Sequence, residues 1–238
     1  MKKKVLTAAL AVALIAIMVS GSLAYFTAED KVDNTFTIGS VKIEIYENGE
    51  ATPDAEKPLG KLTPVVKTTP SDDESYIDKV VKVKNTGAND AYIRTHIAIP
   101  AALYNYLQLD TTPADWNYIG ETTATVGGVD YKVYTFDHAA AVAPDGFTSE
   151  LLQGVYLKSN VDLEEDAAGN LVFILRDANG DKTHSSGFVA HTKTATGTYT
   201  SSTVNVLVAS EAIQAQGFDN GATNALNSGF GQGTNPWQ

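Results

Sequence analysis

Hydrophobic and polar residues alternate along several short stretches of this chain. The first stretch covers residues 41–46, where Val41, Ile43 and Ile45 fall on one face of an extended backbone and Lys42 and Glu44 on the other. A period of two residues is typical of a strand with one buried face. We therefore predict a strand here, ended by the Asn-Gly pair at positions 48 and 49.

Similar patterns recur further along the chain and are separated by turn-forming residues. Further strands are predicted at Ile77–Lys84, Ala91–Ile99, Thr122–Val126, Val129–Phe136, Leu151–Leu157, Leu171–Leu175 and Thr203–Val208. Gly127 and Gly128 would join two of them in a tight hairpin. Eight or more short strands without strand–helix alternation predict an all-β antiparallel sandwich. The pattern alone does not separate a jelly roll from an immunoglobulin-like sandwich.

The remaining segments are expected to be turns, short helices or loosely packed chain. Pro100–Gly120 breaks the alternation and is expected to hold a short helix. The acidic stretches 72–74 and 177–181 are predicted to be turns, and the first of them is expected to be solvated. Ser210–Gln216 could continue the last strand or begin a helix. The Gly- and Asn-rich tail from Gly217 to Gln238 is expected to pack loosely, anchored by a few large apolar side chains.

The N-terminus has the three parts of a secretory signal peptide. Lysines at positions 2 to 4 precede an apolar run from Val5 to Val19, and Ser22-Leu23-Ala24 provides small residues for signal peptidase. Cleavage is predicted between Ala24 and Tyr25. An uncleaved membrane anchor is the alternative, because an apolar segment of about 20 residues can span a bilayer.

The predicted organisation is a signal peptide at 1–24, an N-terminal segment at 25–38 and a β-sandwich domain at 39–238. Loss of the three leader lysines would leave 14 basic against 28 acidic residues, a net charge of about −14. Such a surface repels nucleic acid and anionic lipid, so we expect no nucleic-acid partner, and membrane contact only before cleavage. The chain has no cysteine. Disulfides and thiol chemistry are therefore excluded, and stability must come from the core.

Candidate catalytic and metal-binding residues are few. The four histidines, His96, His138, His184 and His191, include no His-Glu-x-x-His pair. The turn at 177–181 begins like a calcium loop, but no bidentate glutamate stands at the twelfth position, which is Phe188, so a hairpin turn is the preferred interpretation. We therefore predict no catalytic, cofactor-binding or metal-binding residue, and no cofactor.

The leader junction and the residues after it resemble those of a known family. Gly21–Thr27 (GSLAYFT) is followed by Asn34–Val41 (NTFTIGSV), and this combination is similar to the TasA/camelysin family of secreted proteins, which are matured by the signal peptidase SipW. Val83–Arg94, Gly128–Tyr134 and Ala212–Phe218 look like segments shared by members of that family. The resemblance touches most of the chain, and the junction is its most specific part.

The resemblance implies a jelly-roll sandwich that polymerises into the protein fibres of a biofilm matrix, in the extracellular space or at the cell surface. The implied mechanism is strand donation, in which the mature N-terminal segment inserts as a strand into the next subunit. The implied partners are further copies of the chain, a SipW-type signal peptidase and a possible accessory matrix protein. Head-to-tail donation does not close on itself, so it propagates as a filament.

The residues of segment 25–38 permit such donation. All candidate donor residues except Tyr25 have even numbers, so they share one face of an extended chain. Glu29, Lys31 and Asp33 fall on the opposite face, toward solvent. The donor residues are Tyr25, Phe26, Ala28, Val32, Phe36 and Ile38. Asp30 and Asn34 fall on the same face and weaken the fit. Alternatively, the segment is the first strand of its own domain or a flexible leader to it.

Two other functions remain open. Camelysin carries the label of a cell-surface metallopeptidase, although this chain has no recognisable zinc motif. A surface adhesion or glycan-binding module is the third hypothesis, with Trp116 and the tyrosines as its only support. A single Trp in a domain of this size is more often a packing anchor.

Overall fold

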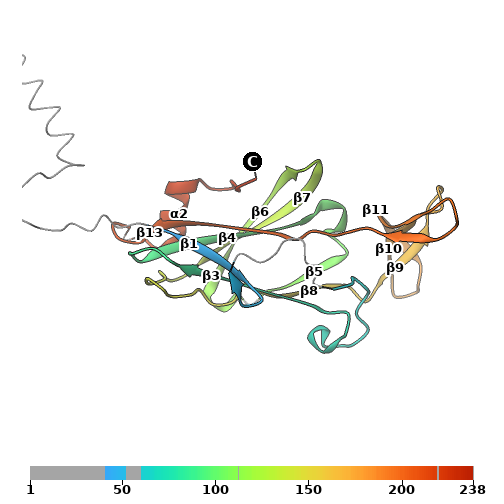
Figure 1. Cartoon of the computed structure of the whole chain (residues 1–238), viewed down its shortest axis with the longest axis horizontal. Coiled ribbons are helices and arrows are strands. Elements are labelled where there is room, and N and C mark those ends of the chain that lie inside the picture. Colours follow the sequence, from blue (N-terminus) through green and yellow to red (C-terminus); the bar gives the residue numbers. More distant parts are fainter. Residues whose placement is uncertain (1–40, 52–59, 112, 219, 238) are drawn as a thin grey trace, which may run out of the picture. The chain divides into compact units, whose positions relative to one another are not determined.

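The computed structural model describes residues 41–51, 60–111, 113–218 and 220–237. The predicted signal peptide, its cleavage site and the donor segment lie outside these ranges. Within them, the chain folds mainly into strands that pair antiparallel in three sheets (Figure 1). The all-β class and the antiparallel pairing are thereby confirmed.

Two of the sheets form a sandwich. The first sheet has the order β2-β1-β3-β8-β5, with β1 (Ile43–Glu47), β2 (Glu50–Ala51), β3 (Ile77–Asn85), β5 (Leu107–Thr111) and β8 (Leu152–Leu157). The second sheet has the order β13-β4-β7-β6, with β4 (Ala91–Pro100), β6 (Trp116–Val126), β7 (Val129–His138) and β13 (Leu207–Gln214). Short 3-10 helices lie in the connections at η1 (Pro70–Asp72), η2 (Ala101–Leu103) and η3 (Pro113–Asp115).

The inner faces of these two sheets meet in one hydrophobic core. Burial alternates along β3, where Val81 and Val83 are fully buried and the lysine between them is partly exposed. Ile93 and Ile97 of β4 enter the same core from the opposite sheet. The two-residue period of β3 thus buries one face of that strand, as expected for a sandwich.

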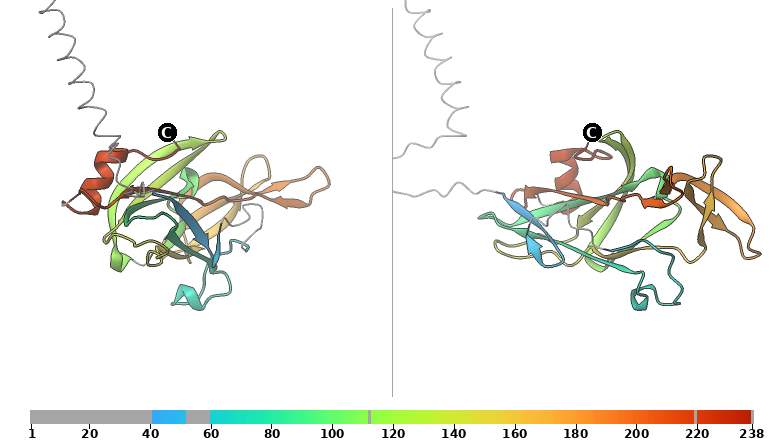
Figure 2. Two further views of the ribbon diagram at one scale, coloured as in Figure 1. Left: turned by 60° about the vertical axis from the view of Figure 1, so that its left-hand side comes forward. Right: turned by 45° about the vertical axis from the view of Figure 1, so that its right-hand side comes forward.

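A third sheet is inserted between β8 and β13. It has the order β12-β11-β10-β9, with β9 (Val161–Glu165), β10 (Leu171–Arg176), β11 (Lys182–Lys193) and β12 (Tyr199–Ser201). It lies at one end of the sandwich (Figures 1 and 2), and Phe173 and Ala190 join the main core. Sequence alternation predicts only β10 of this sheet, because Thr, Ser and charged residues dominate its neighbours.

The predicted strands agree with the structure, with two corrections, and one open choice is settled. Pro100–Gly120 does contain the short helix η2, but β5 and the start of β6 occupy most of it. The strand predicted at Thr203–Val208 begins only at residue 207. The ambiguous segment after it continues as strand β13 to Gln214 and forms no helix. Pairing of β13 with β4 along its whole length stabilises the extended conformation.

The expectation of a loosely packed tail is wrong, whereas its anchoring by large apolar side chains is confirmed for Leu226 and Trp237. Residues Ala222–Phe230 form helix α2, with Ala225 and Leu226 fully buried. The helix contacts β4, β7 and β13 of the second sheet. Beyond it, Trp237 packs on Ala98 and neighbouring residues on the outer face of the same sheet. The tail therefore covers the side of the sheet that faces away from the main core.

The acidic stretch at 72–74 is not simply a solvated turn, because Asp73 is buried. Its carboxylate accepts hydrogen bonds from the backbone N–H groups of Ser75 at 2.9 Å, Lys67 at 2.9 Å and Val66 at 2.7 Å. These backbone donors lower the pKa of Asp73 to about 2. The ionised carboxylate thereby fixes the loop before β3.

The loop around Asp73 is expected to loosen in acid. Because its pKa is depressed in the folded chain, the stabilisation is present above the ordinary carboxyl value of 3.8 and is lost as the pH falls toward about 2. Amide hydrogen exchange at Val66, Lys67 and Ser75 should accelerate over this window. Asp73→Asn should show fast exchange already at neutral pH, whereas Asp72→Asn, at an exposed neighbour, should not. Equal exchange rates in the two variants would contradict the role of the Asp73 carboxylate in fixing this loop.

Candidate functional site

The outer edge of β13 is the feature of the described residues best suited to binding another chain. β13 pairs with β4 from Leu207↔Ala98 to Gln214↔Ala91 and stands at the end of its sheet. No other strand among the described residues pairs with its second edge. An unpaired edge presents a row of N–H and C=O groups that can pair with an added strand.

Burial along this edge is incomplete. All eight residues of β13 are half-buried, whereas the neighbouring strand β4 is almost entirely buried. Val204, Val206 and Val208 pack against the core but remain partly exposed to solvent. Apolar residues that contact a core without being covered form a surface on which further apolar side chains could dock.

The first sheet contributes to the same open edge. β1 contacts β13 and then diverges from it (Figures 1 and 2). Ile43 and Ile45 of β1 are half-buried and pack against the core. One edge of β1 pairs with β3. On its other edge, β2 pairs only with Tyr46 and Glu47, so residues 43–45 have no strand partner on that edge within the described ranges. We refer to Ile43, Ile45, Val204, Val206 and Val208 as the open edge.

A buried polar network supports the sheet that carries β13. Arg94 of β4 donates from Nε and Nη2 to the two carboxylate oxygens of Asp137 of β7, at 2.7 and 3.0 Å. The same guanidinium donates to Asn227 Oδ1 at 2.7 Å and to the carbonyl of Gly231 at 2.9 Å. One side chain therefore ties two strands to helix α2. Exposed fractions of 1% for Arg94 and 0% for Asp137 place the pair out of water.

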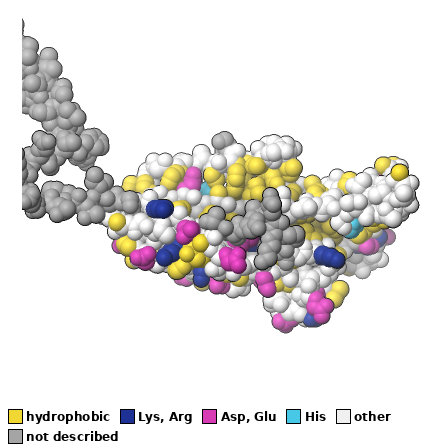
Figure 3. Space-filling view, in the orientation of Figure 1, with side chains coloured by type: hydrophobic (Ala, Val, Ile, Leu, Met, Phe, Trp, Pro, Cys, Tyr) yellow, Lys and Arg dark blue, Asp and Glu magenta, His cyan; other side chains and the backbone are white. Residues whose placement is uncertain are grey.

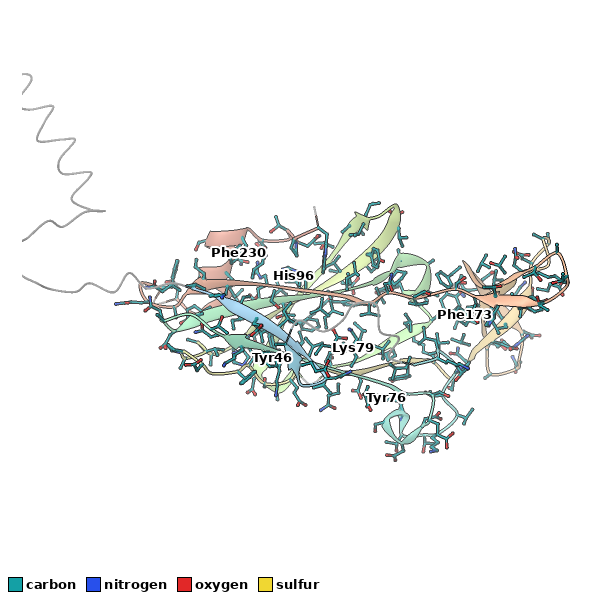
Figure 4. All side chains as sticks on the ribbon, viewed as in Figure 1. Tyr46, Tyr76, Lys79, His96, Phe173 and Phe230 are labelled. Carbon is teal, nitrogen blue, oxygen red and sulfur yellow. The ribbon has the colours of Figure 1, made fainter. Side chains whose placement is uncertain are left out.

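His96 extends this network to β13 and is labelled in Figure 4. Its ring nitrogens lie 3.0 Å from Thr135 Oγ1 and 3.2 Å from Glu211 Oε2, a residue of β13. Burial lowers the pKa of His96, although Glu211 opposes this effect. The histidine is a structural link between β4, β7 and β13. The sequence pattern placed His96 and Arg94 on a polar strand face, but it could not predict that helix α2 and the tail cover them.

The other chemical candidates take structural roles. Trp116 is 3% exposed and donates from Nε1 to the carbonyl of Ser149 at 3.3 Å, so it is a packing anchor and cannot serve as an exposed sugar platform. Asp177 accepts from the N–H groups of Asn179 and Asp181, both at 2.9 Å, which closes the turn between β10 and β11. Among the described residues, no group of three or more His, Asp and Glu side chains could hold a metal ion.

The face shown in Figure 3 carries hydrophobic side chains among scattered acidic and basic groups. The predicted cleavage residues Ala24 and Tyr25 and the remaining donor residues lie outside the described residues, so their positions stay predictions. No helix in the described part of the chain is both long and apolar enough to cross a bilayer. Comparison with protein-family models, curated proteins and solved structures gave no match.

Proposed function

We propose that the protein is a secreted, non-enzymatic structural protein of the TasA/camelysin type that polymerises into extracellular fibres. Each subunit would donate residues 25–38 as a strand to the next subunit. The half-buried open edge beside β13 is the observation that carries this proposal. An added strand there would continue the antiparallel sheet and cover the exposed part of the core.

The sandwich itself supports the finer expectation of a jelly-roll topology. The connections β3–β4, β4–β5, β5–β6 and β7–β8 each pass from one sheet to the other. Such crossings are typical of Greek-key sandwiches, which include jelly rolls. In these folds the edge strands are the natural places for a further strand, because the central strands already have two partners.

A direct binding experiment tests the proposal. A chain beginning at Gly39 is mixed with a labelled peptide of residues 25–38, and binding is followed by fluorescence anisotropy. We expect saturable binding that Val206→Lys weakens strongly, because the new charge would lie in the docking surface. Val129→Lys is the matched control at an exposed valine, the first residue of β7, and it should bind like the parent chain. Equal binding by both variants would place the acceptor elsewhere.

Assembly should accelerate in salt or mild acid. The predicted mature chain carries a net charge of about −14, so subunits repel one another at neutral pH and low ionic strength. Raising the ionic strength to about 0.15 M shortens the screening length to about 8 Å and should shorten the lag before filaments form. Light scattering across a salt series at fixed protein concentration measures this effect. Rates that do not change with salt or pH would contradict it.

A further inference from the structure

Lys79 and Glu47 form a charged pair on the core side of the first sheet. Glu47 of β1 lies opposite Val81 of β3, and Lys79 stands two residues before Val81 on the same buried face. Lys79 Nζ donates a hydrogen bond to Glu47 Oε1, and the two side chains are only 7% and 13% exposed. Two charges at this depth have lost most of their hydration, which is unfavourable unless the charges are neutralised.

Asn48 holds the backbone around this pair in place. Its side chain accepts from the N–H of Val80 at 2.8 Å and donates to the carbonyl of Asp78 at 3.2 Å. Its own N–H donates to the carbonyl of Val80 at 2.9 Å. The residues on both sides of Lys79 are therefore tied to the residue that follows Glu47. The amine and the carboxyl group are kept in contact, as two reacting groups must be (Lys79 is labelled in Figure 4).

We propose that Lys79 and Glu47 condense into an intramolecular isopeptide bond that joins β1 to β3. A proton passes from the ammonium group to the carboxylate, which leaves a neutral amine and a neutral acid. The Nζ lone pair then attacks Cδ of Glu47, and a new N–C bond forms. The C–O bond to one hydroxyl breaks, and this hydroxyl leaves with a proton from Nζ as water. No oxidant, reductant or cofactor is needed.

Three features of the site favour this condensation. Condensation converts the two charged groups into one neutral amide, which removes two charges from a site where both side chains are largely buried. The fixed contact gives the two groups a high effective concentration. The chain also has no cysteine, so a disulfide cannot provide a covalent link between its strands.

The position of the bond suits a subunit of a filament. This part of the inference rests on the proposed function. Strand β1 is the first described strand after the donor segment, so tension between subunits would enter each sandwich through β1. A covalent link at Glu47, the last residue of β1, would transfer that load to β3, which lies inside the sheet.

Peptide mapping of the purified full-length product tests the bond directly. We expect a tryptic species in which residues 43–61 are joined to residues 68–82. Its mass should be that of the two peptides less one water, and the chain should be uncut after Lys79. Fragmentation should place the link between Lys79 and Glu47. Recovery of the two peptides separately, with normal cleavage after Lys79, would overturn the proposal whether or not filaments form.

Two paired variants provide the controls. Lys79→Met with Glu47→Leu replaces the buried pair by apolar groups of similar size and should fold without the linked species. Lys182→Met with Glu164→Leu removes an exposed ion pair, whose side chains are 45% and 41% exposed, and should keep the linked species. A linked species that survives in the first variant would also overturn the assignment.

Discussion

A chain that begins at Gly39 is expected to remain folded and to form no filaments, whereas a chain that begins at Tyr25 assembles. The truncated chain keeps every strand of the described sandwich but lacks the strand that would be donated. Because each head-to-tail contact needs that strand, its removal should abolish growth rather than slow it. Negative-stain electron microscopy and sedimentation of the two chains, at equal concentration, measure the difference.

Two variants of the longer chain separate docking from simple chain length. Phe26→Ser with Phe36→Ser changes the predicted docking face and should also prevent assembly. Glu29→Ser with Lys31→Ser changes the face predicted to lie in solvent and should leave filaments intact. Filaments of normal length from the chain that begins at Gly39 would exclude strand donation. The domain would then have to associate through some other surface.

Loss of either partner of the Arg94–Asp137 pair should destabilise the sandwich severely. Asp137→Ala leaves the guanidinium of Arg94 buried without its carboxylate, and we expect a loss of about 3–5 kcal/mol in the free energy of unfolding. Arg94→Met should cost a similar amount and should also release the contacts to Asn227 and Gly231. Urea denaturation followed by tryptophan fluorescence would measure both changes.

The double variant Arg94→Met with Asp137→Leu is the control for this prediction. Replacing both charges by apolar groups removes the uncompensated charge, so stability should recover part of the loss despite the missing contacts to helix α2. Exposed Asp162→Ala, which breaks a surface pair with Arg176, should change stability by about 1 kcal/mol or less. If the double variant loses as much unfolding free energy as the two single variants together, the two side chains do not act as a pair.

The sequence predicts the central strands well because their alternation reflects the core. Val81 and Val83 of β3 are buried at a two-residue period, as the sequence pattern indicates. Ile93 and Ile97 of β4 lie in the core as predicted, although the tail buries the other face of β4 as well. Strand β11 could not be predicted in this way. It is held by pairing with β10, and most of its side chains remain partly or fully exposed, so its sequence is free to be polar.

The candidate site could be predicted only in part. The alternation of the sequence identifies Val204, Val206 and Val208 as residues of one face. Their partial exposure to solvent follows from the position of β13 as the last strand of its sheet. Sheet order is a property of long-range pairing, which a local pattern does not contain. For the same reason, Arg94 and Asp137 stand 43 positions apart and show no sign in the sequence of being partners.

The pairing of β4 with β13 also bears on the proposed secretion of the chain. These neighbours are about 115 positions apart, since Thr95 of β4 meets Ser210 of β13. Sheets that depend on such distant contacts have high contact order and close slowly. The second sheet cannot be completed before nearly the whole chain has emerged from the ribosome. A polypeptide that crosses a membrane N-terminus first would therefore be threaded through while still unfolded, and its sandwich would form on the far side.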